Sequence, residues 1–160
     1  MKKDFGSFFI LGKPRPQPRP RCVTRGGATW AYNAESTSLR VWKLATKWGA
    51  KQLGVKFGAG ESVGVKIVLH LRSKVRADLD NYAKAMLDAM TGAGLWVDDS
   101  QVDKLEISRR LVEKSDEAGA SVFVWRIVTD PEEAARDDNR ISMKDVARIA
   151  AANAQRGANN

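Results

Sequence analysis

The chain has 160 residues, 43% of them hydrophobic and 29% charged, and these values are typical of one globular domain with a buried core. No apolar run approaches the roughly 20 residues that cross a membrane, and the short, interrupted N-terminal stretch does not fit a signal peptide. One cysteine, Cys22, and one histidine, His70, exclude an internal disulfide and a Cys/His zinc site, so the ligands of any metal are expected to be oxygens. A Cys22–His70 nucleophile pair stays open at this point.

The net charge of +8 is unevenly placed along the chain. Residues 1–77 carry 16 basic and 3 acidic side chains, a net charge of +13, whereas residues 78–160 carry 11 basic and 16 acidic ones, a net charge of −5. A basic half joined to an acidic half predicts one face that binds a polyanion such as nucleic acid, and a second region where carboxylates gather. The alternative is a solvated basic surface without a partner.

The N-terminal part predicts strands around a stiff basic segment. Residues 6–12, GSFFILG, form a short apolar run between glycines and predict a strand. Residues 13–21, KPRPQPRPR, alternate proline with other residues, and because proline fixes φ and lacks an N–H donor we expect an extended, unpaired segment. Residues 22–32 place two β-prone arms around Gly26 and Gly27, which predicts a hairpin.

A helix and a strand are expected next. The helix is predicted over residues 35–48, with Ser36 or Ser38 as its cap, from the near-helical spacing of Leu39, Trp42, Leu44, Ala45 and Trp48. Residues 62–72, SVGVKIVLHLR, have the β-branched content of a partly buried strand.

The second half predicts a helix over 78–94 and strands over 103–113 and 120–128. The whole order favours an α/β (α+β) domain over residues 1–128, in which helices pack on a mixed sheet. Residues 129–160 are expected to form a polar linker and a C-terminal helical or disordered tail. Its amphipathic stretch resembles, as an alternative, the first helix of a helix-turn-helix.

The aromatic residues and the histidine have mostly structural interpretations. Four tryptophans are expected in the core: Trp42, Trp48, Trp96 and Trp125. Trp30 and Tyr32 either belong to the core or stack on splayed bases. His70, inside an apolar strand, is expected to be packed rather than to act as a ligand.

Each acidic residue of the predicted helix and the segment after it has a structural explanation when taken alone. Asp78 or Asp80 can cap the helix. Asp88 follows Lys84 by four residues and can form an ion pair with it. The pair at 98–99 precedes a serine and can belong to a turn.

Taken together, the same acids favour a metal site. If the segment after the helix runs back along it, Asp98 or Asp99 approaches Asp78 and Asp80, with Lys84 on the same helical face. Converging carboxylates repel each other, and a divalent cation removes that cost. With oxygen ligands the expected cation is Mg²⁺, with Mn²⁺ as an alternative, and the chemistry is hydrolysis of a phosphodiester held by the basic half.

The ordered set of residues in RADLDNYAKAMLDAMTGAGLWVDDSQV, together with GKPRPQPRPR near the start, resembles the RusA family of Holliday junction resolvases, which are crossover junction endodeoxyribonucleases. The family pattern is a D-x-D-N-x-x-K helix, a D-A-[LM] helix end, a glycine turn and a D-D-x-Q-V segment. The resemblance covers residues 8–128. The matching positions are Asp78, Asp80, Asn81, Lys84, Asp88, Ala89, Asp98, Asp99, Gln101 and Val102.

The resemblance implies a homodimeric, Mg²⁺-dependent endonuclease that resolves four-way DNA by paired symmetric nicks in recombination and repair. It implies that Asp78, Asp80 and Asp99 are catalytic metal ligands and that Lys84 is catalytic, while Asp98 is a secondary candidate. A cytoplasmic setting, without a membrane and of bacterial or phage and prophage origin, fits such an enzyme. Two features depart from the family: Ala77 stands where a basic residue is usual, and the tail extends beyond the usual end.

Six basic residues are expected to bind DNA, mainly through phosphates: Arg15, Arg19, Arg21, Arg25, Lys74 and Arg76. Two other functions stay open. One is a metal-dependent nuclease that cuts flaps or other branched DNA, and the other is a DNA-binding module in which the acids are only structural.

Overall fold

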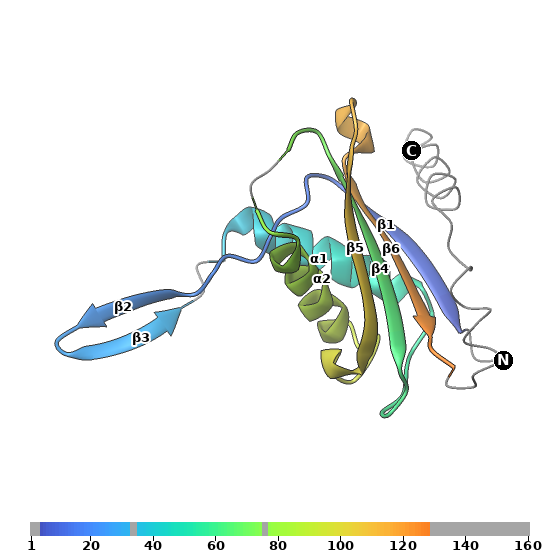
Figure 1. Cartoon of the computed structure of the whole chain (residues 1–160), viewed down its shortest axis with the longest axis horizontal. Helices are drawn as coiled ribbons and strands as arrows, with labels where there is room; N and C mark the ends of the chain where they lie inside the picture. The colour runs from blue at the N-terminus through green and yellow to red at the C-terminus, as the bar shows by residue number, and fades with distance from the viewer. Residues whose placement is uncertain (1–3, 33–34, 75–76, 129–160) are drawn as a thin grey trace.

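The computed structural model describes residues 4–32, 35–74 and 77–128, and within these it has a four-stranded sheet, a separate hairpin and two α-helices (Figure 1). The sheet contains β1 (Phe5–Leu11), β4 (Val63–Leu71), β5 (Val102–Leu111) and β6 (Gly119–Arg126), in the order β1-β6-β4-β5. The hairpin consists of β2 (Arg21–Arg25) and β3 (Ala28–Tyr32), and the helices are α1 (Thr37–Gln52) and α2 (Leu79–Gly92). Short 3₁₀ turns, η1 (Asp99–Gln101) and η2 (Ser115–Glu117), lie before and after β5.

The sheet is mixed, as predicted. β4 and β5 are parallel neighbours, whereas β6 runs antiparallel to both β1 and β4. A parallel pair needs a crossover, and α2 supplies it. The start of α2 therefore follows the edge of the sheet where β4 ends, and its end precedes the edge where β5 begins (Figure 1). This arrangement decides where the acidic residues lie.

Both helices pack against one face of the sheet. Alternation along β4 and β6 directs residues such as Val65, Leu69 and Val122 into a core shared with Leu39 of α1 and Met86 of α2. The opposite face carries a smaller buried cluster of Val68, Phe123 and Trp125, with Ile127 against it.

Three of the four tryptophans predicted in the core are buried, and one is not. Trp42, Trp96 and Trp125 are 4%, 2% and 8% exposed, but Trp48 is 68% exposed. The reason is that α1 carries two apolar stripes. Its buried stripe is Leu39, Trp42, Thr46 and Ala50, and Trp48 falls on the opposite side with two other exposed residues, Val41 and Leu44.

Two glycines and the histidine show how closely the sheet is packed. A Cβ on Gly64 would lie 2.1 Å from the Trp125 ring, and one on Gly119 would lie 2.2 Å from a backbone oxygen. His70 is 2% exposed, and its Nε2 lies 2.9 Å from the hydroxyl of Ser121. The prediction that His70 is a packed residue is confirmed.

The predicted hairpin and α1 are confirmed with small shifts of their ends. Gly26 and Gly27 have φ of 60° and 79°, the left-handed region that the tight turn between β2 and β3 requires. Ser36 caps α1, since its hydroxyl accepts a hydrogen bond from the Leu39 N–H.

One expectation about the proline segment is wrong. Residues 13–20 belong to no helix or strand, but the segment is not unpaired, because Gln17 is buried and its N–H donates to the Asn81 carbonyl at 2.8 Å. Gln17 retains the backbone donor that its proline neighbours lack, and this bond docks the segment on the first turn of α2. The predicted linker and tail, 129–160, lie outside the described residues. Within the described part of the chain, no helix is long and apolar enough to cross a membrane.

Candidate active site

Two carboxylates predicted to be catalytic lie together at the start of α2. Asp78 occupies the N-cap position with extended backbone, φ −70° and ψ 146°, but its side chain makes no capping hydrogen bond. Asp80 is in the first turn, and both residues are exposed. Negative charge is favourable at this end of a helix, because the free N–H groups carry partial positive charge. The position of Asp78 thus agrees with the cap interpretation, but its carboxylate accepts no hydrogen bond from a helix N–H and is left for other partners.

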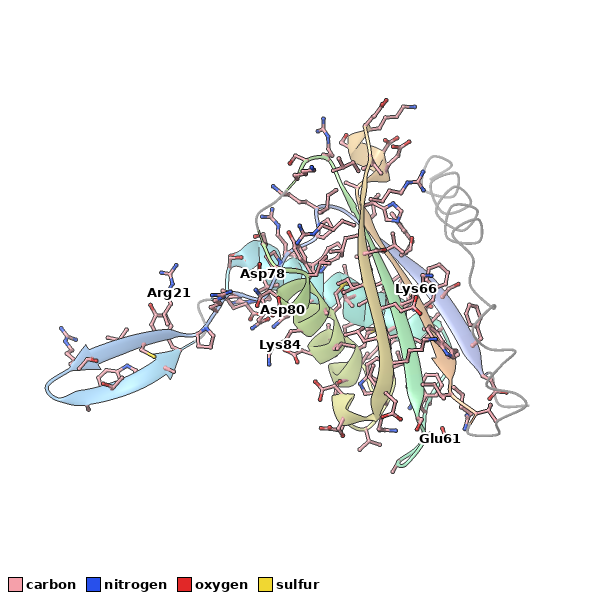
Figure 2. The ribbon with its side chains drawn as sticks, in the orientation of Figure 1. Arg21, Glu61, Lys66, Asp78, Asp80 and Lys84 are labelled. Carbon is pink, nitrogen blue, oxygen red and sulfur yellow. The ribbon has the colours of Figure 1, made fainter. Side chains whose placement is uncertain are left out.

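Lys84 follows one helical turn after Asp80 and is also exposed. In Figure 2 the labels of Asp78, Asp80 and Lys84 run down the side of α2 that lies toward the hairpin. The described residues show no ion pair between Lys84 and Asp88, so the helix-surface pair considered from the sequence does not form.

Arg19 forms an ion pair with Asp78. Its Nη2 donates to the Asp78 Oδ2 at 2.8 Å, with the two side chains 80% and 57% exposed. An exposed pair of this kind contributes little to stability, since water screens it. It does place a guanidinium, predicted to bind phosphate, directly against a predicted metal ligand.

A second guanidinium group, from β5, lies at the same turn. Arg109 of β5 donates from Nη2 to the carbonyl oxygen of Ala77, the residue just before Asp78. Burial raises the pKa of the Tyr82 phenol, and the positive charges of Arg109 and Arg15 oppose this rise. The acids are thus bordered by basic residues from the proline segment and from β5, as a site for a phosphate backbone requires.

Asp98 has a structural role. Its Oδ1 accepts a hydrogen bond from the Ser100 N–H at 2.9 Å, and it forms a capping box with Gln101 at the start of η1. Hydrogen bonds from the side chain and then the backbone of Ser100 hold the pKa of Asp98 below its ordinary value. The turn explanation fits Asp98, whereas Asp99 is exposed, in the first turn of η1.

Gln101 holds this turn in place, a role that sequence reasoning missed. Its Nε2 donates to the carbonyl oxygens of Gly58 at 2.7 Å and Glu61 at 3.0 Å, while its Oε1 accepts from the Val97 N–H at 2.9 Å. Glu61 in turn accepts from Arg126, which also donates to Asp4 at 2.9 Å. The sequence signal was the glutamine of the D-D-x-Q-V segment, but its long-range partners are not visible in the chain order.

The structure does not bring Asp99 to the other two carboxylates within one chain. β5 does run back along α2, but Asp99 precedes β5 and so lies at the edge where β4 and β5 begin. Asp78 and Asp80 follow the edge where β4 ends, and nine strand residues span about 30 Å. Among residues 4–32, 35–74 and 77–128, no three His, Cys, Asp or Glu side chains are close enough to hold a metal ion.

The donor chemistry at the start of α2 still fits a hard divalent cation. Asp78 and Asp80 offer exposed carboxylate oxygens, which Mg²⁺ and Mn²⁺ prefer, and an Mg²⁺ site needs only one or two carboxylates besides water and substrate phosphate. The oxygen donors of these two residues are therefore compatible with such a cation, and no third carboxylate lies close enough to join them among the described residues.

The remaining residues predicted to bind DNA are spread along the adjoining segments. Arg21 and Arg25 are exposed on β2, Lys74 is exposed in the loop before α2, and Arg15 is half-buried. Arg76 lies outside the described residues.

The aromatic pair and the cysteine belong to the hairpin surface. Trp30 and Tyr32 are 48% and 44% exposed on β3, so the core interpretation of these two residues is wrong. Cys22 is exposed on β2 while His70 is buried in the sheet, so the structure does not bring together a Cys–His pair.

Comparison with known proteins places these features in context. The sequence profile described as "Endodeoxyribonuclease RusA" matches residues 12–124, close to the predicted range. The chain is 38% identical over 64 residues to "Crossover junction endodeoxyribonuclease RusA" of Escherichia coli K12, which is 40% of this chain and 53% of that protein. It is 40% identical over 57 residues to the corresponding protein of Enterobacteria phage 82, which is 36% of this chain and 48% of that protein. The matched segments thus span about half the length of these relatives.

Proposed function

This chain belongs to the RusA endodeoxyribonuclease family, and from that premise we propose that it is a structure-selective endodeoxyribonuclease that resolves four-way DNA junctions by paired symmetric nicks. The observation that carries the proposal is the exposed acidic pair at the start of α2, inside the matched range, where Arg19 pairs with Asp78 and Arg109 donates to the carbonyl of the preceding residue. Such an enzyme acts in DNA recombination and repair, in the cytoplasm of a bacterial or phage-infected cell.

Asp78 and Asp80, completed by Asp99, are the proposed ligands of Mg²⁺, with Mn²⁺ as the alternative. When bound, the cation supplies a polarised phosphate and a water of lowered pKa. Lys84 projects from the same helix and stabilises the negative charge that develops on the phosphate oxygens. Arg19 neutralises part of the charge of Asp78, so a phosphate approaching the acids meets less repulsion.

A second copy of the chain is the proposed source of the third carboxylate, which makes the enzyme a homodimer. If two α2 helices lie antiparallel across a two-fold axis, the end of α2 that precedes Asp99 in one copy meets the start of α2 in the other. This arrangement gives two equivalent sites, one for each of the two opposed strands of a junction.

Mixing two inactive variants tests the shared site. A mixed dimer contains one Asp80→Asn copy and one Asp99→Asn copy. If each site takes Asp78 and Asp80 from one copy and Asp99 from the other, one of the two sites keeps all its carboxylates, and nicking of one strand returns. If each copy holds its own complete site, both sites are damaged and the mixture stays inactive. Each variant alone, at the same total concentration, is the control.

The test of the catalytic assignment is Asp80→Asn on a synthetic four-way junction. Loss of a metal ligand is expected to lower the cleavage rate by at least on the order of 100-fold, because mutation of residues that only hydrogen-bond to metal ligands already lowers metal affinity or activity about 10–100-fold. Junction binding is retained or tightened, since a negative charge near phosphates is removed. Asp116→Asn, an exposed acid in η2, is the matched control. Wild-type cleavage by Asp80→Asn would show that the site is elsewhere.

Two alternatives are separated by simple assays. A nuclease for flaps or other branched DNA would cut flaps and forks faster than a mobile four-way junction and would not produce paired nicks. A DNA-binding module would show no carboxylate-dependent heat when titrated with Mg²⁺. In every case the basic surface predicts that binding weakens steeply with salt, because phosphate contacts release counterions.

A further inference from the structure

The hairpin of β2 and β3 has no role in the catalytic assignment. Figure 1 shows it as an arm that projects from the body of the molecule, on the side where α2 begins. All ten strand residues are exposed, and no third strand pairs with it within the described residues. Because an isolated two-stranded hairpin is marginally stable in water, such an arm needs a partner to be held rigidly.

The two faces of the arm differ in chemistry. Residues directly opposite each other in an antiparallel pair share a face, and faces alternate along each strand. One face therefore carries the pairs Arg21–Tyr32 and Val23–Trp30, followed by Arg25 nearer the turn. The other face carries only small side chains: Cys22, Ala31, and the pair Thr24 and Thr29, whose hydroxyls lie 2.9 Å apart.

The positive charge of the hairpin arm and of the proline segment that leads into it indicates the class of partner. Residues 13–32 contain five basic side chains and no acidic one. A face that combines guanidinium groups with half-exposed aromatic rings suits a nucleic acid that offers both phosphates and unstacked bases. The excess of positive charge therefore favours a polyanion as the partner.

The base of the arm is fixed to the catalytic helix. The Gln17 N–H donates to the Asn81 carbonyl at 2.8 Å, and Arg19 is paired with Asp78 at 2.8 Å, just before β2 begins. The base of the arm therefore lies beside the acids, within reach of DNA whose phosphates approach them. Figure 2 shows the Arg21 side chain standing out from the arm.

We propose that the Trp30–Tyr32 face of the arm recognises the branch point by stacking on the bases that a four-way junction exposes where its strands cross, while Arg21 and Arg25 hold the flanking phosphates. This inference rests on the proposed function, since linear duplex has no free base faces along its length. It makes the arm the element that distinguishes branched from linear DNA.

Substitutions at Trp30 test the proposal by junction and linear-duplex binding, measured by fluorescence anisotropy in EDTA so that cleavage does not interfere. A base stack is worth about 1–3 kcal/mol, so Trp30→Ala is expected to weaken junction binding roughly 5- to 150-fold. Its effect on a linear duplex of the same sequence is expected to stay within about two-fold. Trp48→Ala, which removes another exposed tryptophan on α1, is the matched control and leaves both affinities unchanged.

Two further variants separate stacking from support of the hairpin. Trp30→Phe keeps a ring and is expected to retain most of the junction preference. Trp30→Leu keeps an apolar side chain opposite Val23 and is expected to lose that preference. Equal binding by Trp30→Leu and wild type would overturn the proposal, as would equal losses on junction and duplex.

Sedimentation of the same variants addresses the second copy as a partner. If Trp30→Ala dissociates the protein while the monomer binds junctions normally, the arm contacts a second copy and the proposal is wrong. If wild-type protein cuts junctions but Trp30→Ala binds them normally, only this inference fails. If wild-type protein neither prefers nor cuts junctions, the proposed function fails with it.

Discussion

Gln101 connects the turn that presents Asp99 to the rest of the fold, and its removal should affect both stability and cleavage. In Gln101→Ala, the carbonyls of Gly58 and Glu61 lose their donor and the Val97 N–H loses its acceptor. The side chain also accepts a longer bond, 3.3 Å, from the Asp98 N–H.

The expected cost follows from these bonds. Each contributes about 0.5–1.5 kcal/mol net, and the site is half-exposed, so water replaces part of what is lost. We expect Gln101→Ala to lower the free energy of unfolding by about 2 kcal/mol, which corresponds to a fall in Tm of roughly 4–8 °C for a chain of this size. Because the turn then moves, cleavage should fall more than junction binding.

The assay is urea unfolding followed by circular dichroism, with junction cleavage measured on the same samples at a temperature where both proteins are folded. Gln52→Ala, at the exposed end of α1, is the matched control and should stay within about 0.5 kcal/mol of wild type. An unfolding free energy and a cleavage rate like those of wild type for Gln101→Ala would refute the supporting role of this residue.

Three further predictions concern packing, pH and the ion pair at the site. Gly64→Ala places a methyl group where the Trp125 ring lies and should lower the free energy of unfolding, measured in urea, by about 1–3 kcal/mol. In Gly58→Ala the nearest atom is 3.7 Å from the new methyl group, so the free energy of unfolding should change little. Equal losses in the two variants would contradict the packing argument. Burial, assisted by the neighbouring Arg110, lowers the pKa of His70, so the unfolded state binds the proton more readily and stability should fall as pH drops below about 6.5. The free energy of unfolding should change by at most about 1.4 kcal/mol per pH unit from this group, and His70→Gln should reduce that dependence. An unchanged pH profile of Tm in His70→Gln would show that His70 does not cause the pH dependence. Arg19→Gln should leave Tm nearly unchanged because its ion pair is exposed, yet weaken junction binding, and a large loss of Tm would show that the pair is structural.

Local structure was largely predictable because it depends on neighbouring residues. The paired glycines at 26–27 specified the hairpin turn, and alternating or β-branched runs specified the strands of the sheet. α1 was found from its apolar spacing, but Trp48 was misplaced, since hydrophobicity alone does not say which of two stripes faces the core. Packing against the sheet decided that question.

The site was only partly predictable for a related reason. Asp78, Asp80 and Lys84 share one helix, so sequence spacing placed them together correctly. Asp99 depends on how the crossover is arranged, and the parallel pairing of β4 and β5 puts it at the opposite edge of the sheet. The bonds of Gln17 to α2 and of Gln101 to the Gly58 turn join distant segments, and no local pattern signals either of them.

The most direct measurement is to map nicks on a mobile four-way junction labelled on each strand, with Mg²⁺ or EDTA, for wild-type protein and Asp78→Asn. The account predicts symmetric nicks on two opposed strands with Mg²⁺, none in EDTA, and loss of both nicks in Asp78→Asn with junction binding retained. Nicking that persists in EDTA, or at the wild-type rate in Asp78→Asn, would contradict the claim that the acids at the start of α2 perform the cleavage.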